Sequence, residues 1–575
     1  MANDKKMPKN DDASFDKEAR MLRDAQGKGW LVKLKTYFKL SGPGWLQSAI
    51  TLGSGSMASS LYLGVLTGYS MLWLQPIAML LGIIMLSALG YVTLATNQRP
   101  FYAINEHINP ILGWSWALGA MLASIVWAMP QFALASAVLQ QNLFPSLLGP
   151  DSVFGELGST LVVSVLLLGV TIGVTWSYGK GSRGVRIYEM LLKGLVGLVV
   201  LSFFGVVIRL MFVTGTLNWE EIFVGFIPDF SLIFRPADGF KPLLSQLSET
   251  SARYWSNLIV GRQQEVMAAA LSSAVGINMT FLFAYSMLRR KWGSEYQGMM
   301  KFDLATGMLI PFMLATSCVI ISSASQFHTV PQPGFLEQNE AQWEPPASHA
   351  KQYNRLLEGR IGFEFANEKL SEAQIATHIA NLGENDRRMA AILITRDAFD
   401  LAASLQPLLG GLFSNIIFGI GVLGMALSSI SLMMVISGLV LCELVEESYS
   451  DRYFRIGILF PSIAVLGIFF WDQALFWLAI PTSVVTLLIL PLAYVAFLLM
   501  LNNKAIMGEH MPRGKRRVAW NVLMVLSILL IGATSFYMLW NYSGIWGMGA
   551  FGLFLLSIVG YEWAKRRNKN NSFVR

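Results

Sequence analysis

Long apolar segments separated by short polar connections run through most of the chain. Apolar runs of about eighteen or more residues, enough to cross a bilayer as a helix, recur between Pro43 and Tyr561. By this length rule we expect about twelve membrane spans, near residues 43–65, 71–95, 114–141, 159–177, 187–213, 259–288, 303–325, 405–441, 455–471, 474–500, 518–540 and 544–563. The pattern predicts an all-α membrane protein.

Two of these spans are interrupted near their centres by small and polar residues. Gly53-Ser54-Gly55-Ser56 divides the first span, and Gly276-Ile277-Asn278-Met279-Thr280 divides the sixth. Irregular backbone at membrane depth is tolerated only inside protein or beside an aqueous cavity, so a break marks a place where something polar can bind. We expect the helices to unwind at 53–56 and 275–280 and to face each other.

The positions of the two breaks also predict a topology. Interrupted spans at equivalent places, the first and the sixth, indicate two inverted five-helix repeats with a binding site between them near the midplane. The last two spans, 518–540 and 544–563, would follow as two C-terminal helices. The alternative interpretation is that Gly and Ser at these positions serve close helix packing.

Composition and charge narrow the class of protein. Hydrophobic residues make up 54% of the chain and charged residues 14%, which no ordinary soluble domain shows. Lys and Arg gather in short connections that fall on one side of a twelve-span threading, and cytoplasmic loops collect such residues. These clusters lie at Lys5 to Lys35, Lys180 to Arg186, Arg289 to Lys291, Arg513 to Arg517 and Lys565 to Lys569.

This charge bias predicts a multi-pass protein of the cell (inner) membrane with both termini cytoplasmic. It also accounts for the net charge of +7, so we expect the lipid bilayer as a partner and no nucleic acid. Two Cys and five His favour neither a disulfide framework nor a Cys-rich zinc site. No nucleophile elbow or placed catalytic triad is found, so an enzyme is not expected. The oligomeric state stays open.

The chain divides into membrane parts and one long polar loop. We expect a cytoplasmic tail at 1–40, spans one to seven at 41–325, an external loop at 326–402, spans eight to twelve at 403–565 and a second tail at 566–575. The loop contains helix-like periodic runs at 370–382 and 385–402. This periodicity favours a small helical cap over disorder.

Short motifs occur in four separate parts of the chain. They are Gly42-Pro43-Gly44 with Leu46, Leu52 and Gly55, then Gly184, Arg186 and Glu189, then Gly421 through Ser429, and finally Leu490-Pro491 and Lys504 to Gly508. These motifs resemble those of the Nramp family of divalent-metal transporters, whose first span reads approximately GPG-x-L-x-x-x-x-x-L-D-P-G-N and whose fifth opens with G-x-R-x-x-E. The resemblance extends from Gly42 to Gly508 and implies a secondary transporter.

The chain departs from the family at the residues that carry its chemistry. Gly53 and Ser56 stand where the family places its metal-binding Asp and Asn, and Ser54 replaces the Pro between them. The sixth-span M-P-H corresponds to Asn278-Met279-Thr280, and the tenth-span Gln to Ile489. The acidic pair of the third span corresponds roughly to Met129 and Phe132.

What remains at the breaks is a set of hard, uncharged oxygen donors. The predicted substrate-binding residues are Gly53, Ser54, Ser56, Val275, Asn278 and Thr280, of which Gly53, Ser56, Val275 and Asn278 are predicted to bind metal. Without a sulfur ligand the site favours Mg²⁺-like ions over soft transition metals. No Asp or Glu lies near the centre of a predicted span, which argues against proton coupling. The metal would be substrate, and no cofactor is expected.

Two other functions fit the same residues. Backbone N–H groups at the start of a half-helix attract negative charge, so the site could instead bind an amino acid or small organic solute. The chain could also be a membrane sensor or scaffold that transports nothing.

Overall fold

The chain folds into a helical bundle in a computed structural model that describes most of its residues. These are 18–25, 27–149, 152–178, 204–214, 217–336, 347–366, 370–396, 418–446, 451–470 and 475–573, with a few isolated positions between them. No strand occurs in these ranges. The fifth-span motif at Gly184, Arg186 and Glu189, and many positions in the first half of the predicted span 187–213, lie outside them.

Nine helices in the described ranges are long and apolar enough to cross a membrane, or ten if a sharply bent pair counts as one span. The last helix, α26 (Gly514–Phe573), carries two predicted spans, because Gly544 at its middle has a non-helical φ of 52°. With the bent pair counted as one span and these two spans counted separately, the described ranges hold eleven, and the predicted span 187–213 lies partly outside the described residues. The prediction of an all-α membrane protein is confirmed.

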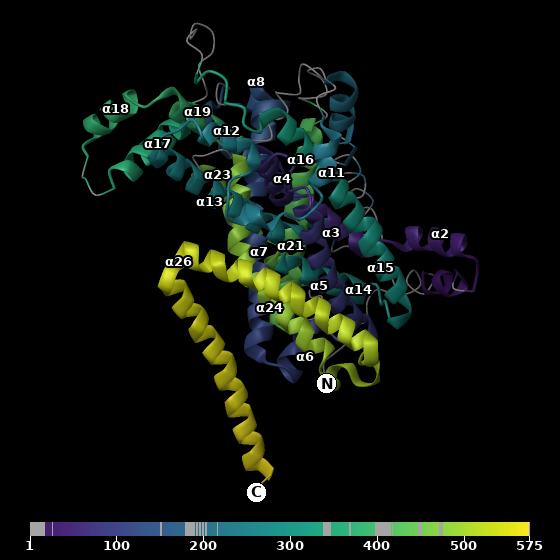
Figure 1. Cartoon of the computed structure of the whole chain (residues 1–575). Helices are drawn as coiled ribbons and strands as arrows, with labels where there is room; N and C mark the ends of the chain where they lie inside the picture. Colours follow the sequence, from purple (N-terminus) through teal and green to yellow (C-terminus); the bar gives the residue numbers. More distant parts are fainter. Residues whose placement is uncertain are drawn as a thin grey trace.

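The first span is built from two half-helices, α3 (Pro43–Thr51) and α4 (Ser54–Thr67). Their axes meet at 51°. In the sixth span, α13 (Glu249–Ala274) is separated from α14 (Ile277–Arg289) by Val275 and Gly276, whose backbone is extended. Figure 1 shows α4 and α13 on one side of the bundle's middle and α3 and α14 on the other.

Both interruptions are shorter than predicted. Helix resumes at Ser54 rather than after Ser56, and at Ile277 rather than after Thr280. The reason is that a Gly at the N-cap position is sufficient to restart a helix, and Gly53 and Gly276 hold those positions. The expected unwinding at 53–56 and 275–280 is therefore wrong in extent, and the non-helical residues are 52–53 and 275–276.

Helix α7 (Pro110–Ala137) lies at the centre of the bundle and packs against α21 (Phe418–Leu444), α14 and α24 (Ala479–Leu501). Helix α4 packs against α13 and α16 (Ile310–Phe327), and α5 (Leu74–Thr96) packs against α13 and α14. Both halves of each broken helix are thus surrounded by continuous helices. This satisfies the requirement that irregular backbone in a membrane be enclosed by protein.

The free end of α3 is fixed by one buried carboxylate. Asp303, in α15 (Gln297–Leu304), is fully buried and accepts a hydrogen bond from the Gly44 backbone N–H at 2.6 Å and another from the Ser41 hydroxyl. A carboxylate at a helix N-terminus meets unpaired N–H groups and the positive end of the helix dipole. Asp303 therefore holds α3 against the seventh span.

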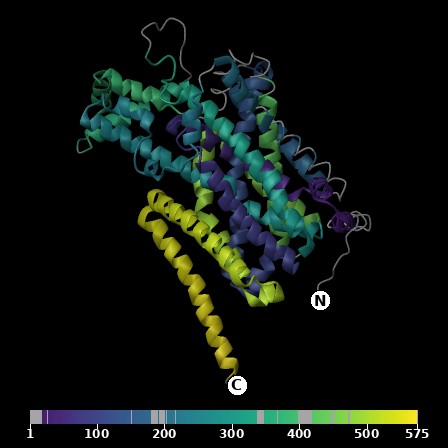
Figure 2. The same ribbon diagram turned by 45° about the vertical axis from the view of Figure 1, so that its right-hand side comes forward.

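Three helices, α17 (Ala347–Glu364), α18 (Glu372–Ala380) and α19 (Glu384–Ile392), form a unit that we call the cap. Figures 1 and 2 show the cap at the end of the bundle opposite α6 (Pro100–His107). Arg360, only 3% exposed, donates to the Ser251 hydroxyl at 2.7 Å, and Asp386 accepts from the Trp255 indole at 2.7 Å. These buried bonds join the cap to α13.

We predict that the cap and the beginning of α26 lie on opposite sides of the membrane. Cysteines would be introduced singly at Glu372 and Lys515, both exposed, and treated with an impermeant thiol reagent in intact cells. The native Cys318 and Cys442 are buried, so background labelling should be low. In intact cells, only position 372 should be labelled. Position 515 should be labelled once the membrane has been permeabilised. Equal labelling of the two positions in intact cells would contradict the topology.

Candidate functional site

The first break is closed by short bonds across the gap. The Ser56 hydroxyl donates to the Thr51 carbonyl at the end of α3. The Ser54 backbone N–H, which has no acceptor inside its own helix, donates to Gln131 Oε1 of α7 at 3.2 Å. Ser54 and Ser56 are at most 1% exposed, so the break is shut off from solvent in this conformation.

The second break is closed in a similar way. Asn278 Oδ1 accepts the Met279 N–H at 3.0 Å, and its amide nitrogen reaches Ser124 Oγ of α7 at 3.4 Å. The sulfur of Met279 accepts the Gly276 N–H at 3.3 Å. Thr280 accepts the Trp116 indole N–H at 2.9 Å. The side chain of Val275 packs against Gly82 of α5.

The two breaks lie against each other. A Cβ atom added at Gly55 would lie 3.2 Å from Ser273 Cβ, and the Ser59 and Ser273 hydroxyls are 3.4 Å apart. Trp127 of α7 reaches both breaks, within 4.0 Å of the Cβ position at Gly55 and 3.7 Å of that at Gly276. The structure thus brings the two interruptions together, although Ser56 and Asn278 each bond within their own break.

Two side chains at the breaks, Gln131 and Ser483, were missed by sequence reasoning. Gln131 bonds to Ser54, while Ser429 of α21, which belongs to a motif found in the sequence, donates to the Ala49 carbonyl at 3.0 Å. Ser483 Oγ of α24 lies 3.2 Å from the Cβ position at Gly55. A polar residue within a long apolar run was the signal that could have found Gln131 and Ser483.

Several buried polar atoms near the breaks have no partner among the described residues. They are Ser54 Oγ, Ser483 Oγ, Gln75 Oε1, Ser48 Oγ and both amide atoms of Gln47. Most buried polar groups in proteins are hydrogen-bonded, and an unpaired one costs about 1–3 kcal/mol. Along α3, α4 and their neighbours these groups form a set suited to water or to a polar solute.

The chemistry of this site is neutral. The hydrogen bonds and close approaches described for the two breaks involve only hydroxyl, amide, indole, thioether and backbone groups. Nowhere in the described ranges do three or more His, Cys, Asp or Glu side chains group as a metal site. Any cation held here would bind to hydroxyl, amide and carbonyl oxygens.

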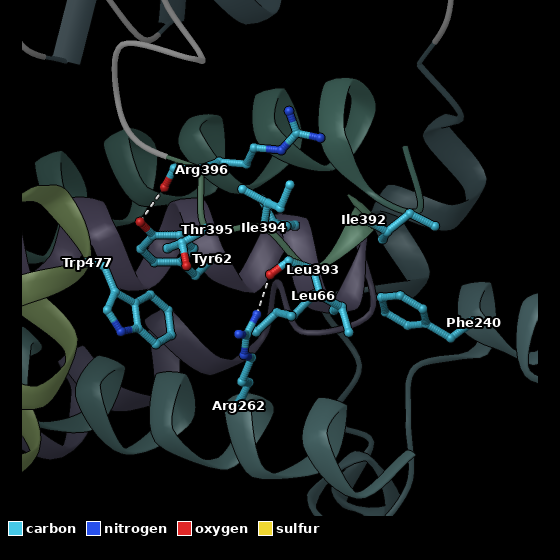
Figure 3. Close-up of a pocket in the computed structure, with 11 residues that line it drawn as sticks. Tyr62, Leu66, Phe240, Arg262, Ile392, Leu393, Ile394, Thr395, Arg396 and Trp477 are labelled. Carbon is cyan, nitrogen blue, oxygen red and sulfur yellow. Dashed lines mark hydrogen bonds between the residues drawn. The ribbon is translucent and has the colours of Figure 1, made fainter. Parts of the chain in front are cut away.

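On the cap side, the path along α4 is covered by residues 392–396, which we call the plug. Figure 3 shows the Tyr62 hydroxyl donating to the Arg396 carbonyl and Arg262 of α13 donating to the Leu393 carbonyl. Ile392, Leu393 and Ile394 are at most 2% exposed. The space left beside Tyr62 and Trp477 is about 10 Å³, roughly enough for one water molecule. The site is closed on this side.

An interrupted first and sixth span meeting inside a helical bundle defines a class, the secondary transporters built from inverted repeats. The sequence model of the family described as natural resistance-associated macrophage protein-like (Nramp) matches residues 44–366 and 387–541. The chain belongs to the Nramp family. The family resemblance inferred from the motifs is confirmed. A search of curated protein sequences finds no significant match.

Solved structures with a similar fold include the manganese transporter of Eremococcus coleocola. A mutant form of that transporter matches at 15% identity and a TM-score of 0.51, covering 92% of this chain and 94% of that one. Its complex with an aromatic bis-isothiourea substituted compound matches at 15% identity and a TM-score of 0.52, covering 93% and 95%. At this identity the likeness concerns the fold, and it confirms the predicted architecture.

We predict that Gly53→Ala destabilises the protein. The added methyl would lie 2.8 Å from the Ile50 carbonyl oxygen and 2.7 Å from Gln131 Nε2, closer than normal contact. Overpacking of this kind costs about 1–3 kcal/mol. Thermal unfolding of the full chain in nanodiscs should show a lower midpoint.

Gly169→Ala is the matched control, because a methyl at this helical position of α9 (Gly155–Tyr178) meets nothing within 4 Å. Its midpoint should stay unchanged or rise slightly, since Ala favours helix over Gly. Equal midpoints for the two variants would show that the first break is not tightly packed.

Proposed function

We propose that the chain is a secondary transporter of a divalent cation, with Gly53, Ser54, Ser56, Val275, Asn278 and Thr280 forming its substrate site. It would act in the cell membrane, with both termini on the cytoplasmic side. The observation that carries the proposal is the close approach of the two broken helices next to their breaks, where a Cβ atom added at Gly55 would lie 3.2 Å from Ser273 Cβ and the Ser59 and Ser273 hydroxyls are 3.4 Å apart. Membership of the Nramp family and the fold shared with a manganese transporter support a metal as the substrate.

The ion would be held by neutral oxygens. Backbone carbonyls at the end of a half-helix lack intrahelical partners. At the end of α3 the Thr51 and Ala49 carbonyls accept from the Ser56 and Ser429 hydroxyls, and these two carbonyls, with that of Val275, would be available when the breaks open. The Gly53 carbonyl accepts the Met57 N–H, so it would have to exchange that bond for the ion. Ser54 Oγ and Ser483 Oγ add buried hydroxyls without partners in the described ranges. Gln131 Oε1 accepts the Ser54 N–H in this structure. It would give up that hydrogen bond and bind the ion instead.

Such a ligand set favours a hard ion of the Mg²⁺ type over a soft transition metal. Hard cations take oxygen ligands, and Mg²⁺ in particular keeps several of its waters. The soft donor nearest Asn278 is Met279, whose sulfur accepts a backbone N–H at 3.3 Å. The proposed ligand set contains no carboxylate to compensate the charge of the ion. An ion that enters with some of its waters would therefore lose less solvation free energy than an ion that sheds all of them.

Transport would run without proton coupling. Intramembrane proton carriers are usually carboxylates or histidines, and the third-span positions Met129 and Phe132 are neither. The membrane potential supplies about 4.6 kcal/mol for two charges at 100 mV. The ion's own gradient and this potential are therefore sufficient to drive uptake.

A small organic solute is a second candidate for the same site. Ser54, Gly55 and Ser56 begin α4, so their N–H groups lie at the positive end of a half-helix. The carboxylate of such a solute could accept the hydrogen bond from the Ser54 N–H in place of Gln131 Oε1. The two candidates demand opposite charge at the site, which makes them separable by experiment.

We predict that Asn278→Asp tightens the binding of a divalent cation tenfold or more. The change keeps the oxygen that accepts the Met279 N–H and exchanges only the amide nitrogen that reaches Ser124. At an effective dielectric near 20, unit charges 4 Å apart attract by about 4 kcal/mol before desolvation. Affinity would be measured from the concentration dependence of Mg²⁺ and Mn²⁺ uptake into proteoliposomes.

Asn521→Asp is the matched control, because Asn521 in α26 bonds to Asn502, which is outside the breaks. It should leave affinity unchanged. A carboxylate substrate would instead be repelled by Asp at 278, and its uptake would be lost. Unchanged affinity for every tested solute in the 278 variant would place the substrate site elsewhere.

A further inference from the structure

A second cavity borders the plug, between the cap and α13. Its volume is about 350 Å³, and we call it the cap-side vestibule; its polar and aromatic lining is Asn257, Arg262, Glu265, Gln352, Arg355, Thr395 and Trp477. The α13 residues recur at helical spacing on one face, and the α17 residues do so on the opposing wall. Small-molecule sites typically measure about 300–1,000 Å³, so the vestibule has room for a small solute.

The charges of the vestibule do not suit a free metal ion. Two guanidinium groups, Arg262 and Arg355, face the same space as one carboxylate, Glu265. The local balance is therefore positive, and a divalent cation would be repelled here. Arginine presents a rigid fork of donors that matches a carboxylate in bidentate geometry.

Two of the lining side chains bond to the plug, and a third bonds to α26. Arg262 donates to the Leu393 carbonyl of the plug, as Figure 3 shows. Glu265 accepts from the Tyr542 hydroxyl of α26 at 3.4 Å. Gln352 accepts the Thr395 N–H at 3.0 Å, while its Nε2 is buried without a partner in the described ranges. That amide is a donor suited to a solute oxygen.

We propose that the cap-side vestibule binds a small carboxylate-bearing solute, amino acids included. Arg262 and Arg355 bind the carboxylate, Gln352 Nε2 donates to it, and Glu265 accepts from an ammonium group where the solute has one. The indole of Trp477 forms an apolar wall. The site is distinct from the breaks, because the plug and Tyr62 separate it from the path along α4.

Binding would be measured by isothermal titration calorimetry on the full chain in nanodiscs, with succinate, L-glutamate, glycerol and MgCl₂ as separate titrants. Succinate and glutamate should bind saturably, and glycerol and Mg²⁺ should not bind at the vestibule. Arg355→Gln and Arg262→Gln should each weaken both carboxylates at least tenfold. Glu265→Gln should weaken glutamate and leave succinate unchanged or tighter.

Arg253→Gln is the matched control, since Arg253 lies on α13, is exposed, and pairs with Glu249 at 3.5 Å away from the vestibule. It should bind like the wild type. Arg262 also holds the plug, so its replacement can disturb folding; Arg355 is exposed and avoids this problem.

No saturable carboxylate binding by the wild type, or equal losses of affinity in Arg253→Gln and Arg355→Gln, would overturn the proposal. Asn278→Asp should not alter this binding, which separates it from substrate binding at the breaks.

Discussion

The need to enclose broken backbone inside a membrane is the constraint on which this structure depends. Two helices are interrupted, and at each interruption α7 supplies one of the partners that the freed polar groups need. Gln131 accepts a hydrogen bond from the Ser54 N–H, and Ser124 accepts one from the Asn278 side-chain amide. Both acceptors lie in α7. Trp127 fills the space against both breaks. Helix α7 is therefore the element that makes two interruptions tolerable at once.

The same arrangement explains why the structure is closed at both ends. On one side, Asp303 holds the N-terminus of α3 through Ser41 and Gly44. On the other, Tyr62 and Arg262 hold the plug against α4 and α13. Each closure rests on a few hydrogen bonds that join a half-helix to a neighbouring segment.

The sequence predicted the architecture well and the site only in part. Apolar run length is set by the bilayer, so the spans could be read directly, and the Gly residues at 53 and 276 marked the breaks correctly. The extent of unwinding could not be predicted from the sequence. It depends on Gly53 serving as the N-cap of α4 while it packs against Gln131 of α7, which is a tertiary contact. A polar residue within an apolar run marks Gln131 and Ser483 as candidates, but the groups that Gln131, Ser483 and Asp303 contact lie far away in the sequence, and no local pattern identifies them. The site residues themselves remain predictions.

The central claim is that a family scaffold without its ionisable residues still carries a divalent cation, through neutral oxygen ligands and without protons. Proteoliposomes containing the full chain and an interior pH dye would be given Mg²⁺, Mn²⁺, Fe²⁺ or amino acids under an inside-negative potential. The account predicts saturable Mg²⁺ uptake that exceeds uptake of the softer ions, with no substrate-dependent acidification. Acidification that accompanies Mn²⁺ or Fe²⁺ uptake, or uptake of amino acids alone, would contradict it.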